Sequence, residues 1–370
     1  MELGDRDYVM DFLILETGYR GGEKGKKHAD FIRTADAIMQ GHPDPLFQTT
    51  LRLLRGVRAY LEIDREFKEA FEMLDRSDEE FAQTANAAWE LSAGRFFLTY
   101  SLHKMGDFAK LRTYTERFIR DAEQRGNVYA RTTISRLRNI LWLVDDDPQG
   151  AREDLKTDSW ISYSQGYHAQ HWLELNARVE IAIYEGTPID QEFLSQHLKG
   201  LKKSFLQAVR GYACDTAWLM GRLALSELGQ DPSQKRVVLR AMARLRSYDT
   251  QYSRTIASML RATLALHEND AESATRYFRE VVTIGDLTNL YFIAAAARRR
   301  LGELLGGDKG RDLVAAAERW MTEAGIKNFD RMTDLASPPA RPGKLLAANA
   351  ELPVPRETYP AVDRRSAMRP

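Results

Sequence analysis

Residues 260–278, LRATLALHENDAESATRYF, hold the pattern that decides the fold. Before the central Asn269-Asp270 pair, small and apolar side chains recur at helical spacing. After the pair, Ala274 and Phe278 lie four residues apart, on one face of a second helix. Asp270 is suited to accept hydrogen bonds from the free N–H groups at the start of that helix. The stretch therefore predicts two helices joined by a tight turn.

The same arrangement recurs about every 40 residues along the chain. Its turn signals are Gly21-Gly22, Asp64, Gly106-Asp107, Asp147-Pro148, Thr187-Pro188, Asp231-Pro232, Asn269-Asp270 and Gly307-Asp308. A second set of breaks should separate one helix pair from the next, at Ser77-Asp78, Arg125-Gly126-Asn127, Gln165-Gly166, Tyr248-Asp249 and Gly285-Asp286. Since the sequence shows no convincing period-2 alternation, we expect helix pairs throughout and no strands.

The small residues Ala262, Ala265 and Ala274, together with Phe278, resemble the packing positions of a tetratricopeptide repeat. The standard unit of that family has about 34 residues, so these units are longer. We therefore expect an all-α, right-handed superhelical solenoid of about eight degenerate TPR-like hairpins over residues 1–335. The first helix of each hairpin would line a concave groove.

Residues 336–370 differ from the rest, because they carry seven of the chain's 12 prolines and no helical pattern of any length. This composition predicts a Pro-rich, disordered tail. The sequence thus divides into a helical array and an extension whose role the pattern does not specify.

Charge and composition exclude several partners. The 370 residues include 53 basic and 53 acidic side chains, so no global charge attracts nucleic acid or an anionic membrane. No apolar stretch approaches the roughly 18 residues of a membrane span, and the N-terminus does not resemble a signal peptide. We expect a cytoplasmic protein. Its one cysteine, Cys214, lies in an apolar stretch and is expected to be buried.

The most unusual segment is residues 160–172, WISYSQGYHAQHW. On a helix beginning near its middle, Tyr167, His171, Glu174 and Arg178 fall on one polar and aromatic stripe. Three interpretations are open, namely packing between helices, contact with a ligand or partner, and metal binding through the histidines. No further Cys or His cluster supplies the other ligands of a metal. We therefore expect neither a metal nor another cofactor.

Arginines on other first helices extend the possible binding surface. These residues are Arg131, Arg138, Arg210, Arg254 and Arg261. Together they would make a basic groove for a peptide carboxylate or another anion. The alternative is ordinary surface charge. The run Arg298-Arg299-Arg300 is interpreted as a solvated helix end, because consecutive helical residues point in different directions.

No catalytic motif is present. The sequence lacks Gly-x-Ser-x-Gly, His-Glu-x-x-His and the kinase His-Arg-Asp and Asp-Phe-Gly signatures. The acidic run Asp145-Asp146-Asp147 falls at a predicted turn, where helix capping explains it. We expect no catalytic residues and no enzymatic activity.

Several stretches resemble the C-terminal helical region of large bacterial serine/threonine protein kinases of the myxobacterial and planctomycete type. The residues that carry the resemblance are 141–148, 166–172, 221–225 and, most closely, 298–308 with 317–321. The resemblance covers roughly residues 80 to 335 and implies a sensory or partner-binding helical array. This chain contains no kinase domain, so no catalytic residue is carried over.

Two functions follow as hypotheses. In the first, the chain is a non-catalytic interaction scaffold in bacterial signalling that binds a protein or peptide segment in its concave groove. In the second, it is a regulatory sensor that binds a small ligand near Tyr167, His171, Glu174 and Arg178. A long open groove would favour the scaffold, and a closed pocket beside His171 would favour the sensor.

Overall fold

The computed structural model describes residues 45–339, apart from 63–66, 85–86 and 158–165. Within those residues the chain forms α-helices and one short 3-10 helix, and no strand. The helices are α3 (Pro45–Glu62), α4 (Phe67–Ala82), α5 (Ala88–Met105), α6 (Phe108–Gln124), α7 (Val128–Leu137), α8 (Asn139–Val144), α9 (Pro148–Thr157), α10 (Ala169–Glu185), α11 (Gln191–Lys203), η2 (Phe205–Ala208), α12 (Arg210–Glu227), α13 (Gln234–Tyr248), α14 (Gln251–His267), α15 (Ala271–Leu287), α16 (Tyr291–Leu305), α17 (Gly307–Glu323) and α18 (Phe329–Ala336). Gly21-Gly22, Asp64 and most of the predicted tail lie outside the described residues.

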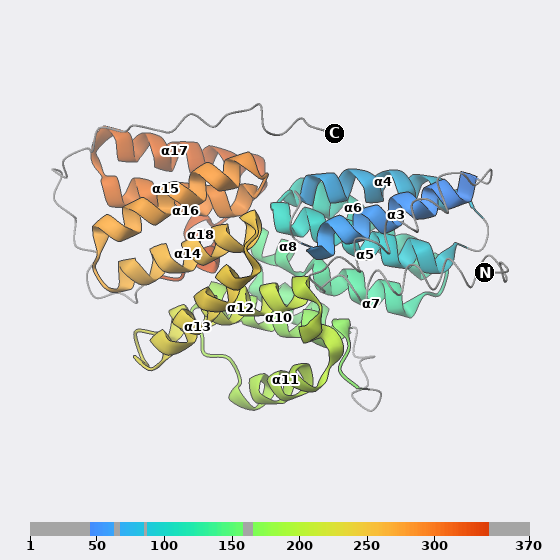
Figure 1. The fold of residues 1–370 in the computed structure, drawn as a ribbon, viewed down its shortest axis with the longest axis horizontal. Coiled ribbons are helices and arrows are strands. Elements are labelled where there is room, and N and C mark those ends of the chain that lie inside the picture. The colour runs from blue at the N-terminus through green and yellow to red at the C-terminus, as the bar shows by residue number, and fades with distance from the viewer. Residues whose placement is uncertain (1–44, 63–66, 85–86, 158–165, 340–370) are drawn as a thin grey trace.

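The helices pack in neighbouring pairs, which confirms the all-helical prediction (Figure 1). The turn signals from Gly106 onward fall between the two helices of a pair or at the start of the second helix, as at Asn269-Asp270 between α14 and α15 and at Gly307-Asp308 in the first turn of α17. The side chain of Asp270 accepts a hydrogen bond from the backbone N–H of Ser273 at 3.0 Å. Asp107 caps α6 in the same way, through the N–H of Lys110 at 3.2 Å. The capping chemistry predicted at these turns is therefore confirmed.

Two of the predicted breaks are wrong. Ser77-Asp78 lies inside α4, and Gly285-Asp286 lies inside the last turn of α15. Asp78 is buried, and its carboxylate accepts hydrogen bonds from Arg95 at 2.6 Å and from Arg117 at 2.9 Å. A helix continues through this acidic residue because arginines on the next hairpin compensate its buried charge.

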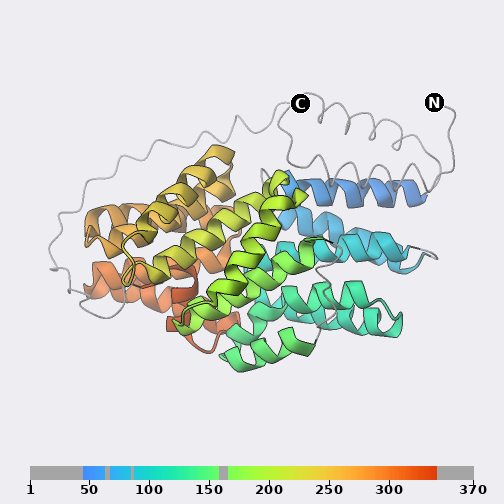
Figure 2. The same ribbon diagram turned by 90° about the horizontal axis from the view of Figure 1, so that it is seen from below.

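The C-terminal end of the described array packs back against helices near its centre. In Figure 1 the N-terminal helices α3–α8 and the C-terminal helices α14–α18 lie on opposite sides, with α10 and α12 between them. The last helix, α18, packs against α10 and α16. Just before it, the N–H of Lys327 donates to the carbonyl of Val144 at 2.9 Å. The view in Figure 2 shows the paired helices stacked side by side.

The arginine run 298–300 is not a solvated helix end. Arg300 is buried, and its guanidinium donates to the Ser337 carbonyl at 3.1 Å and pairs with Asp334. Arg299 pairs with Glu318 at 3.2 Å. The prediction failed because α18 and the residues after it fold back over this part of α16, where they supply acceptors for the arginines.

Cys214 is buried, as predicted. Its position in the core of α12 raises the pKa of the thiol well above the ordinary value, because burial penalises the thiolate. The thiol therefore behaves as a small apolar side chain.

Candidate functional site

The predicted stripe Tyr167, His171, Glu174 and Arg178 does come together, at the start of α10. The Tyr167 hydroxyl lies 3.1 Å from Nδ1 of His197, which belongs to α11. The Tyr167 and His171 rings stack with their centroids 5.2 Å apart. Arg178 donates to Glu174 at 2.7 Å. These contacts join the side chains to one another and to α11.

The α11 helix is shaped to receive this stripe. Gly200 leaves room for the Tyr167 ring, since a Cβ at that position would lie 2.4 Å from Cδ2 of the ring. Arg178 lies over the Phe193 ring, 4.4 Å from its centroid. Burial lowers the pKa of His197 to about 4, although the nearby Glu174 acts in the opposite direction. The stripe packs the α10–α11 hairpin, and a ligand contact there stays a prediction.

The predicted metal alternative finds no support within the described residues, where no group of His, Cys, Asp and Glu side chains could hold an ion. His171 instead accepts a hydrogen bond from the backbone N–H of His168 at 3.0 Å, at the start of α10. A surface cleft of about 220 Å³ lies nearby, between α9, α10 and α11. Of the predicted stripe, Arg178 alone borders it.

The five predicted arginines are spread over three helices. Arg131 and Arg138 belong to α7 and its end, Arg210 begins α12, and Arg254 and Arg261 lie on α14. Arg138 pairs with Asp154 on α9 at 2.7 Å, and the exposed Arg254 pairs with Asp249 at 3.2 Å. Arg210 donates to the carbonyl of Tyr248.

The three partners, Asp154, Asp249 and the Tyr248 carbonyl, lie on neighbouring helices or at an adjacent turn. Among the described contacts, none joins two of the five arginines to each other. A shared basic groove therefore stays a prediction.

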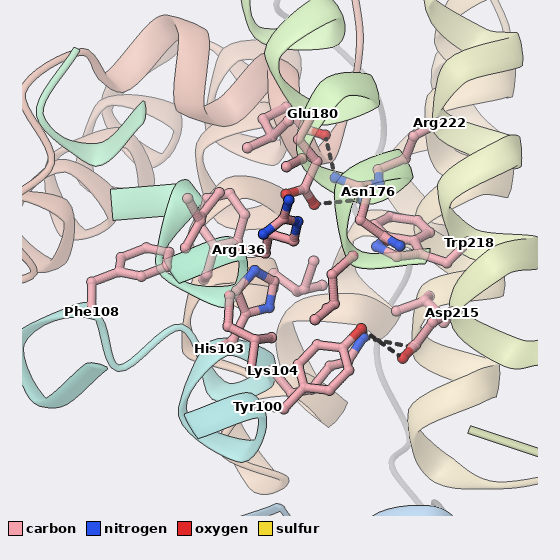
Figure 3. A pocket seen from close by; sticks show the side chains of 18 of the residues that line it. Tyr100, His103, Lys104, Phe108, Arg136, Asn176, Glu180, Asp215, Trp218 and Arg222 are labelled. Carbon is pink, nitrogen blue, oxygen red and sulfur yellow. Dashed lines mark hydrogen bonds and ion pairs between the residues drawn. The ribbon is translucent and has the colours of Figure 1, made fainter. Parts of the chain in front are cut away.

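Sequence reasoning missed a buried, charged cavity at the centre of the molecule, which Figure 3 shows. The cavity has a volume of about 60 Å³ and is lined by side chains of α5, α6, α7, α8, α10, α12, α14, α16 and α18. Its charged members are Lys104, Arg136, Glu180, Asp215 and Arg222. The cavity thus lies where helices from both ends of the array converge.

Asp215 is the centre of the first group of contacts. Its carboxylate pairs with Lys104 at 2.6 Å and accepts hydrogen bonds from Tyr252 at 3.0 Å and Tyr100 at 3.2 Å. Lys104 also donates to the Tyr252 hydroxyl at 3.1 Å. Burial, with the Asp215 charge nearby, holds the pKa of both tyrosines well above the ordinary value. The two phenols are therefore neutral donors that stabilise the carboxylate.

Arg222 is the centre of the second group. It pairs with Glu180 at 3.0 Å and donates to the carbonyl of Leu335 at 3.1 Å, which fixes the C-terminal helix α18. Its guanidinium also lies over the Trp218 ring, 4.9 Å from the centroid. In Figure 3 the Asp215 and Arg222 groups occupy opposite ends of the cavity, with Arg136 and His103 between them.

His103 lies in the same lining, and its buried Nδ1 has no hydrogen-bond partner among the described residues. Burial lowers its pKa to about 4, assisted by the charges of Lys104 and Arg222 and opposed by those of Glu180 and Asp215. The imidazole is therefore neutral near pH 7 and offers one donor and one acceptor. The His103 side chain lines the cavity.

One sequence signal could have found this cavity. Lys104, Asp215 and Arg222 are isolated charges within largely apolar stretches of two first helices, α5 and α12. Buried charges need partners, and none lies nearby on the same helix. Such residues must therefore find partners across the fold, although the sequence does not show which ones.

Comparisons with protein families, curated proteins and solved structures give no significant match to this chain. None of the described helices combines the length and apolar character needed to cross a bilayer. The fold and the charged cavity are therefore the observations from which function has to be argued.

Proposed function

We propose that this chain is a non-catalytic interaction scaffold of bacterial signalling, a right-handed TPR-like superhelix of about eight hairpins that binds a segment of a partner protein. One observation carries the proposal. Large apolar side chains are exposed together at the N-terminal ends of the first helices α5 and α7, namely Trp89 (43% exposed), Val128 (42%) and Tyr129 (50%). We refer to these three residues as the aromatic edge.

The helix ends that carry the aromatic edge are joined. Asn127, which caps α7, donates from its side chain to the Ser92 hydroxyl of α5 at 3.1 Å. Between the two helices lies a small cleft of about 30 Å³, bordered by Tyr129 and Leu91. The cleft is large enough for a small apolar group at the tip of a partner side chain.

The cleft also has a rigid charged wall. Arg95 pairs with Asp121 and Asp78, and its guanidinium lies over the Phe118 ring, 4.6 Å from the centroid. Exposed aromatic residues beside a preformed cleft are typical of binding hot spots. The partner would present an aliphatic or aromatic anchor to the aromatic edge, with polar groups around it.

The inner side of the array is a poorer place for a partner segment. There α18 packs against α10 and α16, and the first helices converge on the small central cavity. The outer aromatic edge is therefore preferred to the concave groove. The resemblance to the C-terminal region of bacterial kinases supports the signalling context.

The test compares two double variants in affinity capture from extracts of the source cells. Trp89→Ser with Tyr129→Ser removes the aromatic edge, and we expect at least about a tenfold loss of the captured partner. Arg178→Ala with Arg210→Ala alters two predicted groove positions and should retain that partner. Equal capture by the aromatic-edge variant and the unaltered protein would refute the proposed surface. If the arginine variant alone loses the captured partner, the concave groove is favoured as the binding site.

A further inference from the structure

We propose that the central cavity binds a small carboxylate anion with a short aliphatic chain, of the acetate and propionate class. This site is separate from the aromatic edge and does not depend on it. Three features of the cavity carry the inference, namely its size, its surplus of hydrogen-bond donors, and its apolar wall.

Size limits the ligand. The cavity measures about 60 Å³, and a bound water occupies about 10–15 Å³ on the same scale. There is thus room for about five non-hydrogen atoms, which is the size of a carboxylate with one or two further carbons. This space is too small to hold a whole nucleotide, sugar or peptide segment.

The polar lining offers donors in excess of acceptors. Lys104 has three N–H groups, and its described hydrogen-bond and ion-pair partners are Asp215 and Tyr252. Nε of Arg222 is buried without a hydrogen-bond partner, and His103 contributes a further unpartnered ring nitrogen. Buried donors without acceptors are costly, so a ligand that brings acceptor oxygens is favoured.

The acidic residues of the lining do not oppose an anion strongly. The Asp215 carboxylate already accepts from Lys104, Tyr252 and Tyr100. Glu180 is paired with Arg222. Arg136 adds another cationic side chain to the same lining. A carboxylate placed among these donors gains charge-assisted hydrogen bonds from several cationic side chains at once.

The rest of the wall is apolar, and this selects against a bare inorganic anion. The apolar part of the wall consists of side chains from α6, α8, α10, α14 and α16, which include Phe108, Ile140, Leu173, Ile256 and Phe292. Phosphate would present oxygens on all sides to this wall, with a desolvation cost that the apolar side chains cannot offset. A short alkyl chain fits against it, with the carboxylate toward His103 and the cations.

The experiment monitors the NMR signals of the His103 imidazole in the unaltered protein. Histidine-labelled protein is titrated with acetate and propionate, and the ring ¹H–¹⁵N signals are followed by NMR. We expect a saturable shift of the His103 signal, while His267, which contacts the Pro338 carbonyl outside the cavity, does not move. Propionamide, which has the same shape and no charge, should bind about tenfold more weakly or less.

Matched variants test the same site by calorimetry. His103→Leu removes both ring nitrogens and should abolish propionate binding, whereas His267→Leu makes the same change elsewhere and should retain it. The inference is overturned by a linear, unsaturated shift shared by all histidines, or by equal binding of propionamide. Tighter binding of inorganic phosphate than of propionate, or propionate binding that survives in His103→Leu, also overturns it.

Discussion

Two regions of the molecule hold a buried histidine whose pKa is lowered to about 4, namely the α10–α11 hairpin with His197 and the central cavity with His103. In both regions the cause is burial of the imidazole. Yet His197 has a hydrogen-bond partner in Tyr167, and Nδ1 of His103 has none among the described residues. A lowered pKa is therefore common to both regions, and the two histidines differ in whether Nδ1 has a hydrogen-bond partner.

The two regions also differ in how they are assembled along the chain. Tyr167 and His197 are 30 residues apart and belong to one hairpin, whereas Tyr100 and Asp215 are 115 residues apart. The hairpin is a local arrangement with an obvious sequence signature. The cavity exists only when the two ends of the array close on each other.

The largest expected effect comes from removing the centre of the first group of contacts in the cavity. Asp215→Ala leaves the Lys104 charge buried without its carboxylate, and this should lower the free energy of unfolding by about 3–5 kcal/mol. The matched change in the hairpin is Glu174→Ala, which leaves the half-exposed Arg178 free to be hydrated and should cost less than about 1 kcal/mol. Chemical denaturation at pH 7 measures both. Similar costs would show that the cavity network is no more critical than the hairpin.

The next effect concerns the two histidines and pH. The folded chain keeps His103 and His197 neutral down to about pH 4, whereas unfolding returns them to the ordinary pKa of 6.5. Between these values the unfolded state binds more protons, so stability is present above pH 6.5 and is lost as the pH falls toward 4. Each histidine should contribute a loss of up to about 3 kcal/mol over that range.

The same substitution at the two histidines separates their roles. At pH 7.5, His197→Leu loses the contact with Tyr167 and should cost about 1 kcal/mol, while His103→Leu loses no described hydrogen bond and should be neutral or stabilising. Both should reduce the loss of stability on acidification, measured by urea unfolding at pH 7.5 and 5. A large destabilisation by His103→Leu at pH 7.5 would mean that its ring has a structural partner.

The outcomes of the sequence predictions follow the same division between local and distant contacts. The turn at Asn269-Asp270 and the capping by Asp270 depend on neighbouring residues and were predicted correctly. The helix running through Asp78 and the burial of Arg300 depend on partners from other hairpins or from α18, and both were predicted wrongly. The cavity escaped prediction because each of its isolated charges has a partner on a different helix, far away in the sequence.

A last pair of substitutions tests how tightly the hairpin is packed. Gly200→Ala would place a Cβ 2.4 Å from the Tyr167 ring, so α11 or the ring must shift, at a cost of about 1–3 kcal/mol. Gly211→Ala is the matched control, because its nearest neighbour would be the Leu61 carbonyl at 3.7 Å, an ordinary contact. There the higher helix propensity of alanine should stabilise by about 0.5–1 kcal/mol. If Gly200→Ala lowers the thermal stability and Gly211→Ala raises it, the Tyr167 ring packs tightly against α11. A stabilising Gly200→Ala would contradict this packing and would favour a ligand contact for the stripe.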